Sequence, residues 1–167
     1  DHNSFLESEK KVKTKNEKLL SINGKKSVES LHRELGKIMW DNCGMSRNKK
    51  DLETAIIDIK KLKNDFWGNV FVPGKADQLN TELEKAGRVA DFIELGELMI
   101  RDALDRNESC GGHFREEYQT PEGEALRDDE NYTFVSAWEH RGEEKDPVRH
   151  KEDLKYDVVK PTQRSYK

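Results

Sequence analysis

Apolar residues recur at helical spacing along the first two-thirds of the chain. Between residues 28 and 43 they stand three and four positions apart, which predicts an amphipathic helix with one apolar face. Ser27 is suited to cap its N-terminus, because a serine hydroxyl accepts a hydrogen bond from a free N–H of the first turn, and Gly44 is a natural end. The face consists of Val28, Leu31, Leu35, Ile38 and Met39.

Residues 47–71 repeat this pattern and predict a second helix. Ser46 or Asn48 can cap its N-terminus, and Pro73-Gly74 ends it. Its apolar stripe consists of Leu52, Ile56, Ile59, Leu62, Phe66 and Val70.

Residues 76–107 predict the longest helix, which would span roughly 48 Å at about 1.5 Å per residue. We expect its apolar middle to be buried on more than one side, and Gly87 and Gly96 to let a neighbouring backbone approach closely. One stripe holds Leu79, Leu83, Ala86, Ala90, Ile93, Ile100 and Leu104, and Val89, Phe92, Leu95, Leu98 and Met99 extend it.

Short connections between these three helices favour antiparallel neighbours. The predicted fold is therefore mainly α: an up-down-up three-helix bundle over residues 27–107, similar to a spectrin repeat. Residues 1–26 precede it as a lead-in helix and connector, with the helix at 5–21 and a break at Asn23-Gly24. The apolar stripe of that helix is thin and interleaved with five lysines, Lys10, Lys11, Lys13, Lys15 and Lys18.

Residues 108–167 differ from the helical part and predict an extended C-terminal tail. The alternation over 132–138 and again at Leu154, Tyr156 and Val158 predicts two or three short strands that could form one small ribbon, with a polar loop at 141–147 between them. There are too few apolar residues here for a second core, yet five aromatic residues lie close together, so we expect the tail to lie against another surface. These aromatics are Phe114, Tyr118, Tyr132, Phe134 and Trp138.

The composition excludes several classes of protein. Charged residues make up 38% of the 167 positions, against about 25% in ordinary soluble domains. No run of roughly 18 apolar residues could span a membrane. The net charge of −4 argues against sequence-independent nucleic-acid binding. With only Cys43 and Cys110, we expect free thiols in a reducing compartment rather than a disulfide scaffold.

No pattern of residues predicts an active site, a metal site or a cofactor site. Cys110 and His113 are metal-ligand types, but two ligands without a second pair favour a turn built on Gly111-Gly112. Residues 24–27 resemble the last part of a phosphate-binding loop, but the glycine that begins this motif is missing from the required position upstream. Cys43 and His32 are expected to pack, and the Lys cluster to be a solvated helix face, with contact to an anionic partner as the alternative. The acidic groups Glu94/Glu97, Glu116/Glu117 and Asp128/Asp129/Glu130 are too common at this charge density to indicate catalysis.

Four segments carry a family resemblance. The first two are residues 32–44 and 95–118, and the second of these ends in a Glu-Ser-x-Gly-x-His pattern at 108–113. Residues 127–131 (Arg-Asp-Asp-Glu-Asn) and the ending Gln163-Arg164-Ser165-Tyr166 follow in order. Together they resemble the C-terminal domain of the succinate dehydrogenase/fumarate reductase flavoprotein subunit. Many members carry Arg at the position of Cys110; the Cys form with the longer insert at 119–126 resembles one bacterial branch, which leaves the physiological direction open.

The resemblance implies a helical, non-catalytic domain of an oxidoreductase subunit that interconverts succinate and fumarate. Such a domain packs on the flavin and capping domains of its own subunit, which hold FAD and the substrate. The whole subunit docks on an iron–sulfur subunit beside a membrane anchor, on the cytoplasmic face of the inner membrane. None of the family's catalytic or flavin-binding motifs occurs here, so no catalytic, cofactor-binding or metal-binding residue is assigned.

Because the chain starts at Asp1 rather than Met, we expect a piece of a longer polypeptide. The alternative hypothesis is a stand-alone helical module that binds a helix or strand of a partner protein.

Overall fold

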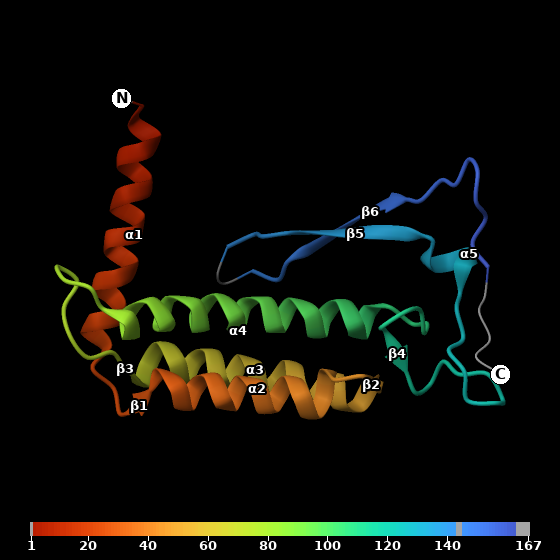
Figure 1. Ribbon diagram of the computed structural model, residues 1–167, viewed down its shortest axis with the longest axis horizontal. Helices are drawn as coiled ribbons and strands as arrows, with labels where there is room; N and C mark the ends of the chain where they lie inside the picture. Colours follow the sequence, from red (N-terminus) through yellow and green to blue (C-terminus); the bar gives the residue numbers. More distant parts are fainter. Residues whose placement is uncertain (1, 143–144, 163–167) are drawn as a thin grey trace. The chain divides into compact units, whose positions relative to one another are not determined.

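A computed structural model describes residues 2–142 and 145–162 (Figure 1). The ending at residues 163–166, part of the family resemblance, lies outside the described residues. The chain divides into two compact units, residues 1–105 and residues 106–167. The helices are α1 (Asn3–Ile22), α2 (Val28–Cys43), α3 (Lys49–Asn69), α4 (Thr81–Asp105) and α5 (Asp129–Tyr132), and the strands are β1 (Lys26–Ser27), β2 (Ser46–Arg47), β3 (Val70–Phe71), β4 (Phe114–Arg115), β5 (Phe134–Glu139) and β6 (Val148–Asp153).

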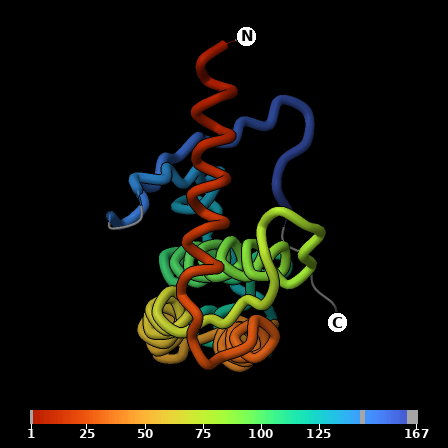
Figure 2. Tube along the Cα trace, turned by 90° about the vertical axis from the view of Figure 1, so that its left-hand side faces the viewer, coloured from red at the N-terminus to blue at the C-terminus, as the bar shows by residue number. Residues whose placement is uncertain are grey.

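The first unit is built from α1 to α4, and α2, α3 and α4 each pack on the other two (Figures 1 and 2). The mainly α prediction is confirmed. β1, which leads into α2, pairs in parallel with β3, which follows α3, so the start of α2 lies beside the end of α3. α2 and α3 therefore run in opposite directions. The core between them is apolar and includes Leu31, Leu35, Leu52, Ile59, Phe66, Ile93 and Ile100.

Side-chain caps set where α2 and α3 begin. The Ser27 hydroxyl accepts a hydrogen bond from the Ser30 N–H at 3.1 Å, as predicted. Of the two candidates for α3, Asn48 is the cap, and its Oδ1 accepts from the Asp51 N–H at 2.9 Å. α3 ends at Asn69, two residues before the expected position. The reason is that Val70 and Phe71 form β3 and pair with β1 instead of continuing the helix.

The predicted start of α4 is wrong by five residues. The helix begins at Thr81 rather than Ala76, because the Asn80 Oδ1 accepts from the Leu83 N–H at 2.9 Å and so caps the first turn. Leu79, which was placed in the apolar stripe, precedes this cap and is 95% exposed.

The two glycines of α4 differ. A Cβ on Gly96 would lie 2.9 Å from Ile59 Cδ1 and 3.2 Å from Met39 Sδ, so this position does permit close helix packing. A Cβ on Gly87 would have nothing within 4 Å, so the same expectation is wrong there. Burial on more than one side is also wrong for the chain by itself, since several apolar side chains of α4 are 42% to 54% exposed, namely Phe92, Leu95 and Met99.

α1 is attached to the other helices only by its second half. Leu19 is buried, the Lys15 Nζ lies 2.8 Å from Asp91 Oδ1 of α4, and the Lys18 ammonium lies over the Trp67 ring of α3. The first half stands away from α2 to α4 and leaves Phe5 and Val12 exposed (Figure 2). The expected helix is confirmed, and its thin apolar stripe is buried only where it meets α3 and α4.

The second unit has little regular structure. β5 and β6 pair antiparallel, and their register runs from Phe134↔Asp153 to Glu139↔Val148. The strand predicted near 132–138 is therefore confirmed, whereas the one predicted at Leu154 to Val158 is wrong. β5 begins at Phe134, separated from α5 by one residue, so this pairing offers no strand residue opposite the chain beyond Asp153. The Leu154 N–H donates to the Thr133 carbonyl at 3.0 Å.

Candidate functional site

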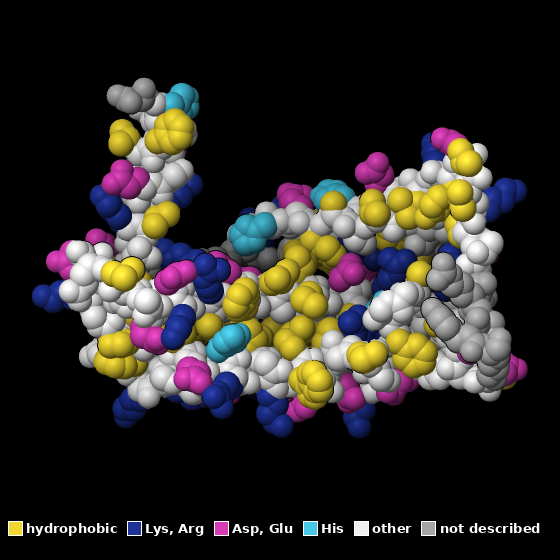
Figure 3. Space-filling model, in the orientation of Figure 1, with side chains coloured by type: hydrophobic (Ala, Val, Ile, Leu, Met, Phe, Trp, Pro, Cys, Tyr) yellow, Lys and Arg dark blue, Asp and Glu magenta, His cyan; other side chains and the backbone are white. Residues whose placement is uncertain are grey.

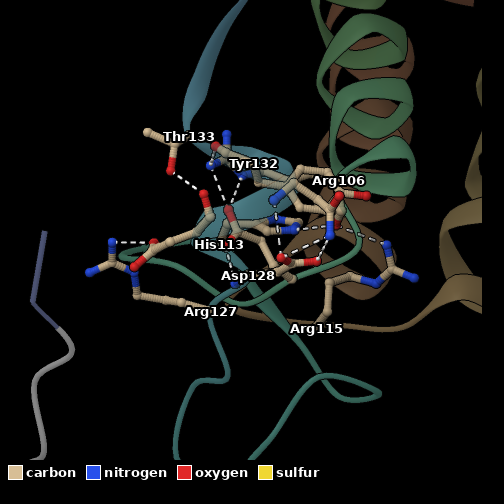
Figure 4. A network of polar contacts seen from close by, with 10 residues as sticks. Arg106, His113, Arg115, Arg127, Asp128, Tyr132 and Thr133 are labelled. Carbon is tan, nitrogen blue, oxygen red and sulfur yellow. Dashed lines mark hydrogen bonds and ion pairs between the residues drawn. The ribbon is translucent and has the colours of Figure 1, made fainter. Parts of the chain in front are cut away.

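A network of polar side chains forms the densest group of functional residue types in the second unit (Figure 4). At its centre is the Glu108 carboxylate, which is 2% exposed. Its Oε1 accepts a hydrogen bond from Arg106 Nε at 2.8 Å, and its Oε2 accepts one from the Asp128 backbone N–H at 2.8 Å. One buried charge therefore joins two segments that lie twenty residues apart in the sequence.

Arg106 and Asp128 carry the network toward α5. The Arg106 Nη2 donates to the Tyr132 carbonyl at 3.2 Å, and its guanidinium lies 5.8 Å from the centre of the Tyr132 ring. The Asp128 side chain caps α5 by accepting from the Asn131 N–H at 3.1 Å. A short helix of one turn has little stability of its own, so these contacts are what define it.

Cys110 and His113 close the tight turn expected at Gly111-Gly112. Their backbones exchange two hydrogen bonds, at 2.8 and 3.0 Å, across Gly111-Gly112. Gly111 has a φ of +59°, as the first central residue of a type II′ turn requires. The His113 Nε2 donates to the Arg106 carbonyl at 2.9 Å, which uses one of its two possible ligand atoms. In residues 2–142 and 145–162, no three His, Cys, Asp or Glu side chains are grouped as metal ligands would be.

Arg115 is 1% exposed and was not predicted to be buried. Its Nε donates to Glu117 Oε2 at 3.1 Å, and its guanidinium lies 5.5 Å from the centre of the Tyr118 ring. The Ser109 hydroxyl accepts from the Arg115 N–H at 2.8 Å and donates to its carbonyl at 3.1 Å. These reciprocal bonds hold the chain on both sides of the turn at 110–113.

Arg127 attaches the last described residues to the network. Its guanidinium bonds to the Asp129 carboxylate, and its Nη1 donates to the Thr162 carbonyl at 3.0 Å. The hydrogen bond to Asp129 raises the pKa of Arg127 above its ordinary value, so this cation stays charged at any physiological pH. The described end of the chain is thus held by a side chain 35 positions earlier.

The hydrogen bonds of the network join separate stretches of backbone. Among the described residues, every buried side-chain nitrogen or oxygen has a hydrogen-bond partner. Glu108 accepts from an arginine and a backbone N–H, and the Ser109 hydroxyl is bonded to the N–H and the carbonyl of Arg115. What the arrangement does is fix the backbone of 106–133 without an apolar core.

The other candidate residues are accounted for by ordinary contacts. Cys43 is buried at the end of α2, and burial raises the pKa of its thiol, which lowers its reactivity. The Glu94 Oε1 lies 2.6 Å from the Lys63 Nζ, and the Glu97 Oε1 accepts a hydrogen bond from the Arg101 Nε at 2.9 Å. In the segment 24–27, which resembles the end of a phosphate-binding loop, the Gly24 N–H donates to the Val70 carbonyl.

The lysines of α1 are divided between anchoring and exposure. Lys15 and Lys18 contact α4 and α3, and Lys13 lies 2.6 Å from Glu9 on the same helix. Lys10 and Lys11 are exposed. None of the helices among the described residues is both long enough and apolar enough to cross a bilayer.

The residues of this network fall within a known family pattern. Residues 32–166 match the family described as fumarate reductase flavoprotein C-term. The chain belongs to this family. The fumarate reductase flavoprotein subunit of Helicobacter pylori matches 89% of this chain at 28% sequence identity. The succinate dehydrogenase flavoprotein subunit of Bacillus subtilis matches 93% of it at 24% identity. The chain spans 20% and 26% of those two relatives.

The fold is also similar to that of solved structures. An E. coli quinol fumarate reductase chain superposes with a TM-score of 0.82 over 98% of this chain and 27% of that one, at 21% sequence identity. The resemblance read from residues 32–44, 95–118 and 127–131 is therefore confirmed. The burial of Arg115 and Glu108 was missed, because nothing local in the sequence marks two charges as interior; their place in an aromatic-rich stretch is the one available signal.

Proposed function

We propose that this chain is the non-catalytic C-terminal domain of a flavoprotein subunit that interconverts succinate and fumarate. In this proposal FAD and the substrate are held by the flavin and capping domains of the same subunit. The subunit exchanges electrons with an iron–sulfur subunit, which sits beside a membrane anchor on the cytoplasmic face of the inner membrane. The family match over residues 32–166 carries the proposal.

The contacts of the network support a docking role rather than catalysis. A catalytic group needs a free lone pair or proton directed at substrate. Glu108, Ser109 and Arg115 instead bond to side chains and backbone within residues 106–128. We therefore assign no catalytic, flavin-binding or metal-binding residue to this chain.

The elements present do not fit a dinucleotide. Flavin adenine dinucleotide is usually held at the carboxyl edge of a parallel sheet, where a glycine-rich turn leads into a helix. β1 and β3 pair in parallel, but each is only two residues long. No G-x-G-x-x-G sequence occurs in the chain. This supports placing the flavin in the rest of the subunit.

The proposal is tested by flavin absorbance and by succinate-dependent dye reduction. The complete subunit is expected to carry flavin and to turn over succinate. The 167-residue chain, with its helical circular dichroism recorded as a folding control, is expected to do neither. Flavin or turnover at one site per chain in the isolated chain would overturn the proposed role.

A further inference from the structure

α2 and α4 leave an apolar groove on the surface of the first unit. At one end lies a pocket of about 240 Å³ whose lining includes Val28, His32, Val89 and Phe92. The His32 and Phe92 rings lie 5.8 Å apart and join the two helices across it. Figure 3 shows hydrophobic side chains gathered over α2 and α4 on this face.

Beyond the pocket, α2 continues with an exposed face. His32, Gly36 and Trp40 are four residues apart, so they lie above one another on one face of the helix. Trp40 is 83% exposed, which is unusual for the largest apolar side chain. A Cβ on Gly36 would meet nothing within 4 Å, so no part of the described chain occupies the space above it.

α4 supplies the other side of the groove. Phe92, Leu95 and Met99 are spaced by three and four residues and are all exposed. The contact between the His32 and Phe92 rings, 5.8 Å apart, places the start of this row next to the row on α2. The six residues of the two rows, His32, Gly36, Trp40, Phe92, Leu95 and Met99, are here called the α2–α4 groove.

The charges at the pocket end are neutralised within the chain. Three ion pairs lie at or beside the pocket, each between a basic side chain and the Oε1 of a glutamate. The distances are 2.8 Å for Arg88 Nη2–Glu84, 2.7 Å for Lys85 Nζ–Glu82 and 2.7 Å for Arg33 Nη2–Glu29. A charged group entering the groove would lose its water without gaining an unpaired opposite charge. The complementary surface is therefore apolar and uncharged.

We propose that the α2–α4 groove holds an amphipathic helix supplied by the part of the flavoprotein subunit outside the span of this chain. Two neighbouring rows of side chains, each repeating every helical turn, form the ridges between which a third helix packs, and Gly36 lets its backbone approach closely. We place this helix in the rest of the subunit because the matches to this chain span only 20% and 26% of the two relatives described above. The inference rests on the proposed function.

Photo-crosslinking in the complete subunit tests this occupant. p-Benzoyl-phenylalanine replaces His32, Gly36 or Trp40 in turn, and the crosslinked residues are identified by mass spectrometry. Each step of four residues along α2 advances about 6 Å. Along a partner helix that distance is about four residues, whereas along a partner strand it is about two. Crosslinked residues that advance by three or four per step, within the same subunit, are expected.

Lys37 is the matched control, because it lies on α2 but outside the groove and is exposed. A yield from the three groove positions no higher than from Lys37 would overturn the inference. Steps of about two residues, or crosslinks to a second copy, to another subunit or to lipid, would overturn it as well. Flavin content and succinate turnover are measured on the unmodified subunit, so failure of the proposed function is recognised separately.

A glycine pair tests the close approach. Gly36→Ala and Gly68→Ala each add one methyl group at an exposed helical position with nothing within 4 Å, but Gly68 lies on α3 outside the groove. Gly36→Ala is expected to reduce the crosslink yield from Trp40 at least threefold, and Gly68→Ala to leave it unchanged. Equal yields in the two variants would contradict the packing of a helix over Gly36.

Discussion

The two units of this chain are stabilised in different ways. The first unit buries an almost purely apolar core between α2, α3 and α4. Among the described residues of the second, Phe134 is the only buried hydrophobic side chain, while Glu108, Ser109 and Arg115 are buried polar groups. Apolar burial is non-directional and tolerates local change, whereas each polar contact of the network needs its own partner. The second unit should therefore be the more sensitive to single polar substitutions.

The largest effect is expected in the apolar core. Leu35→Ala removes a side chain that is 5% exposed and should lower the free energy of unfolding by about 2–5 kcal/mol, because it loses apolar burial and leaves a cavity. Urea unfolding followed by circular dichroism measures the change. Leu79→Ala removes the same atoms from an exposed position and should have an effect within about 0.5 kcal/mol. Equal effects in the two variants would mean that the core is misplaced.

The second unit is tested at Glu108. Glu108→Gln removes the charge that accepts from Arg106 and the Asp128 N–H, and should destabilise residues 106–133 by about 1–3 kcal/mol. Hydrogen exchange should speed up at the Asp128 and Asn131 amides while the amides of α2 to α4 keep their protection. Glu122→Gln, in an exposed loop, is the control. Faster exchange throughout α2 to α4 would contradict the separate stabilisation of the two units.

A local polar contact in the first unit sharpens the comparison. Ser27→Ala removes the α2 cap and should cost about 1 kcal/mol, less than a core truncation although it changes a defined hydrogen bond. Ser8→Ala, within α1, is the control, since alanine is the better helix former there. Thermal unfolding of both variants gives the difference, and a Ser27→Ala variant as stable as the parent chain would rule out the cap.

Substitution of the glycines of α4 should have smaller effects, and at Gly87 the variant should be more stable than the parent chain. Gly87→Ala should raise the free energy of unfolding by about 0.5–1 kcal/mol, because alanine is favoured in helices and its methyl group meets nothing within 4 Å. Gly96→Ala should gain less or lose stability, because Ile59 and Met39 must move. Urea midpoints compare the two, and a larger gain at Gly96 would contradict the packing between α2, α3 and α4.

The smallest effect concerns pH. The hydrogen bond from Lys26 holds the pKa of Asp65 below its ordinary value of 3.8, and the same bond, followed by that to Glu34, raises the pKa of Lys26 above 10.5. The stabilisation from Asp65 is present above pH 3.8 and is lost as the pH falls through its folded pKa. That from Lys26 is present below 10.5 and is lost at higher pH. Lys26→Met should therefore lower the urea midpoint slightly at pH 7 and by less at pH 2; an equal loss at both would contradict the ion pair.

The presence of the helices could be predicted because the apolar spacing and the capping residues that indicate a helix lie within one short segment of sequence. The stripe from Val28 to Met39 and the cap at Ser27 are read within one segment, and both are confirmed. The start of α4 was missed because Ala76 to Leu79 continue the apolar period, while Asn80 captures the first-turn N–H and begins the helix later. At this position the capping side chain, and not the apolar spacing, determines where the helix begins.

Non-local pairings were not predictable. The alternation at Leu154 to Val158 is strand-like, but strand pairing depends on register, and β5 begins only at Phe134 opposite Asp153. Likewise nothing near Glu108 in the sequence indicates that the Asp128 N–H will bond to it. The turn at 110–113 was expected from Gly111-Gly112 and is confirmed, because two glycines specify it locally.

The most direct test of a supporting role is succinate–dye turnover per bound flavin in the complete subunit carrying Glu108→Gln. If the network only holds the domain in place, the amount of folded, flavin-containing subunit falls while turnover per flavin and the KM for succinate stay unchanged. A changed KM or a loss of turnover per flavin, with Glu122→Gln normal, would place the network in catalysis and contradict the account.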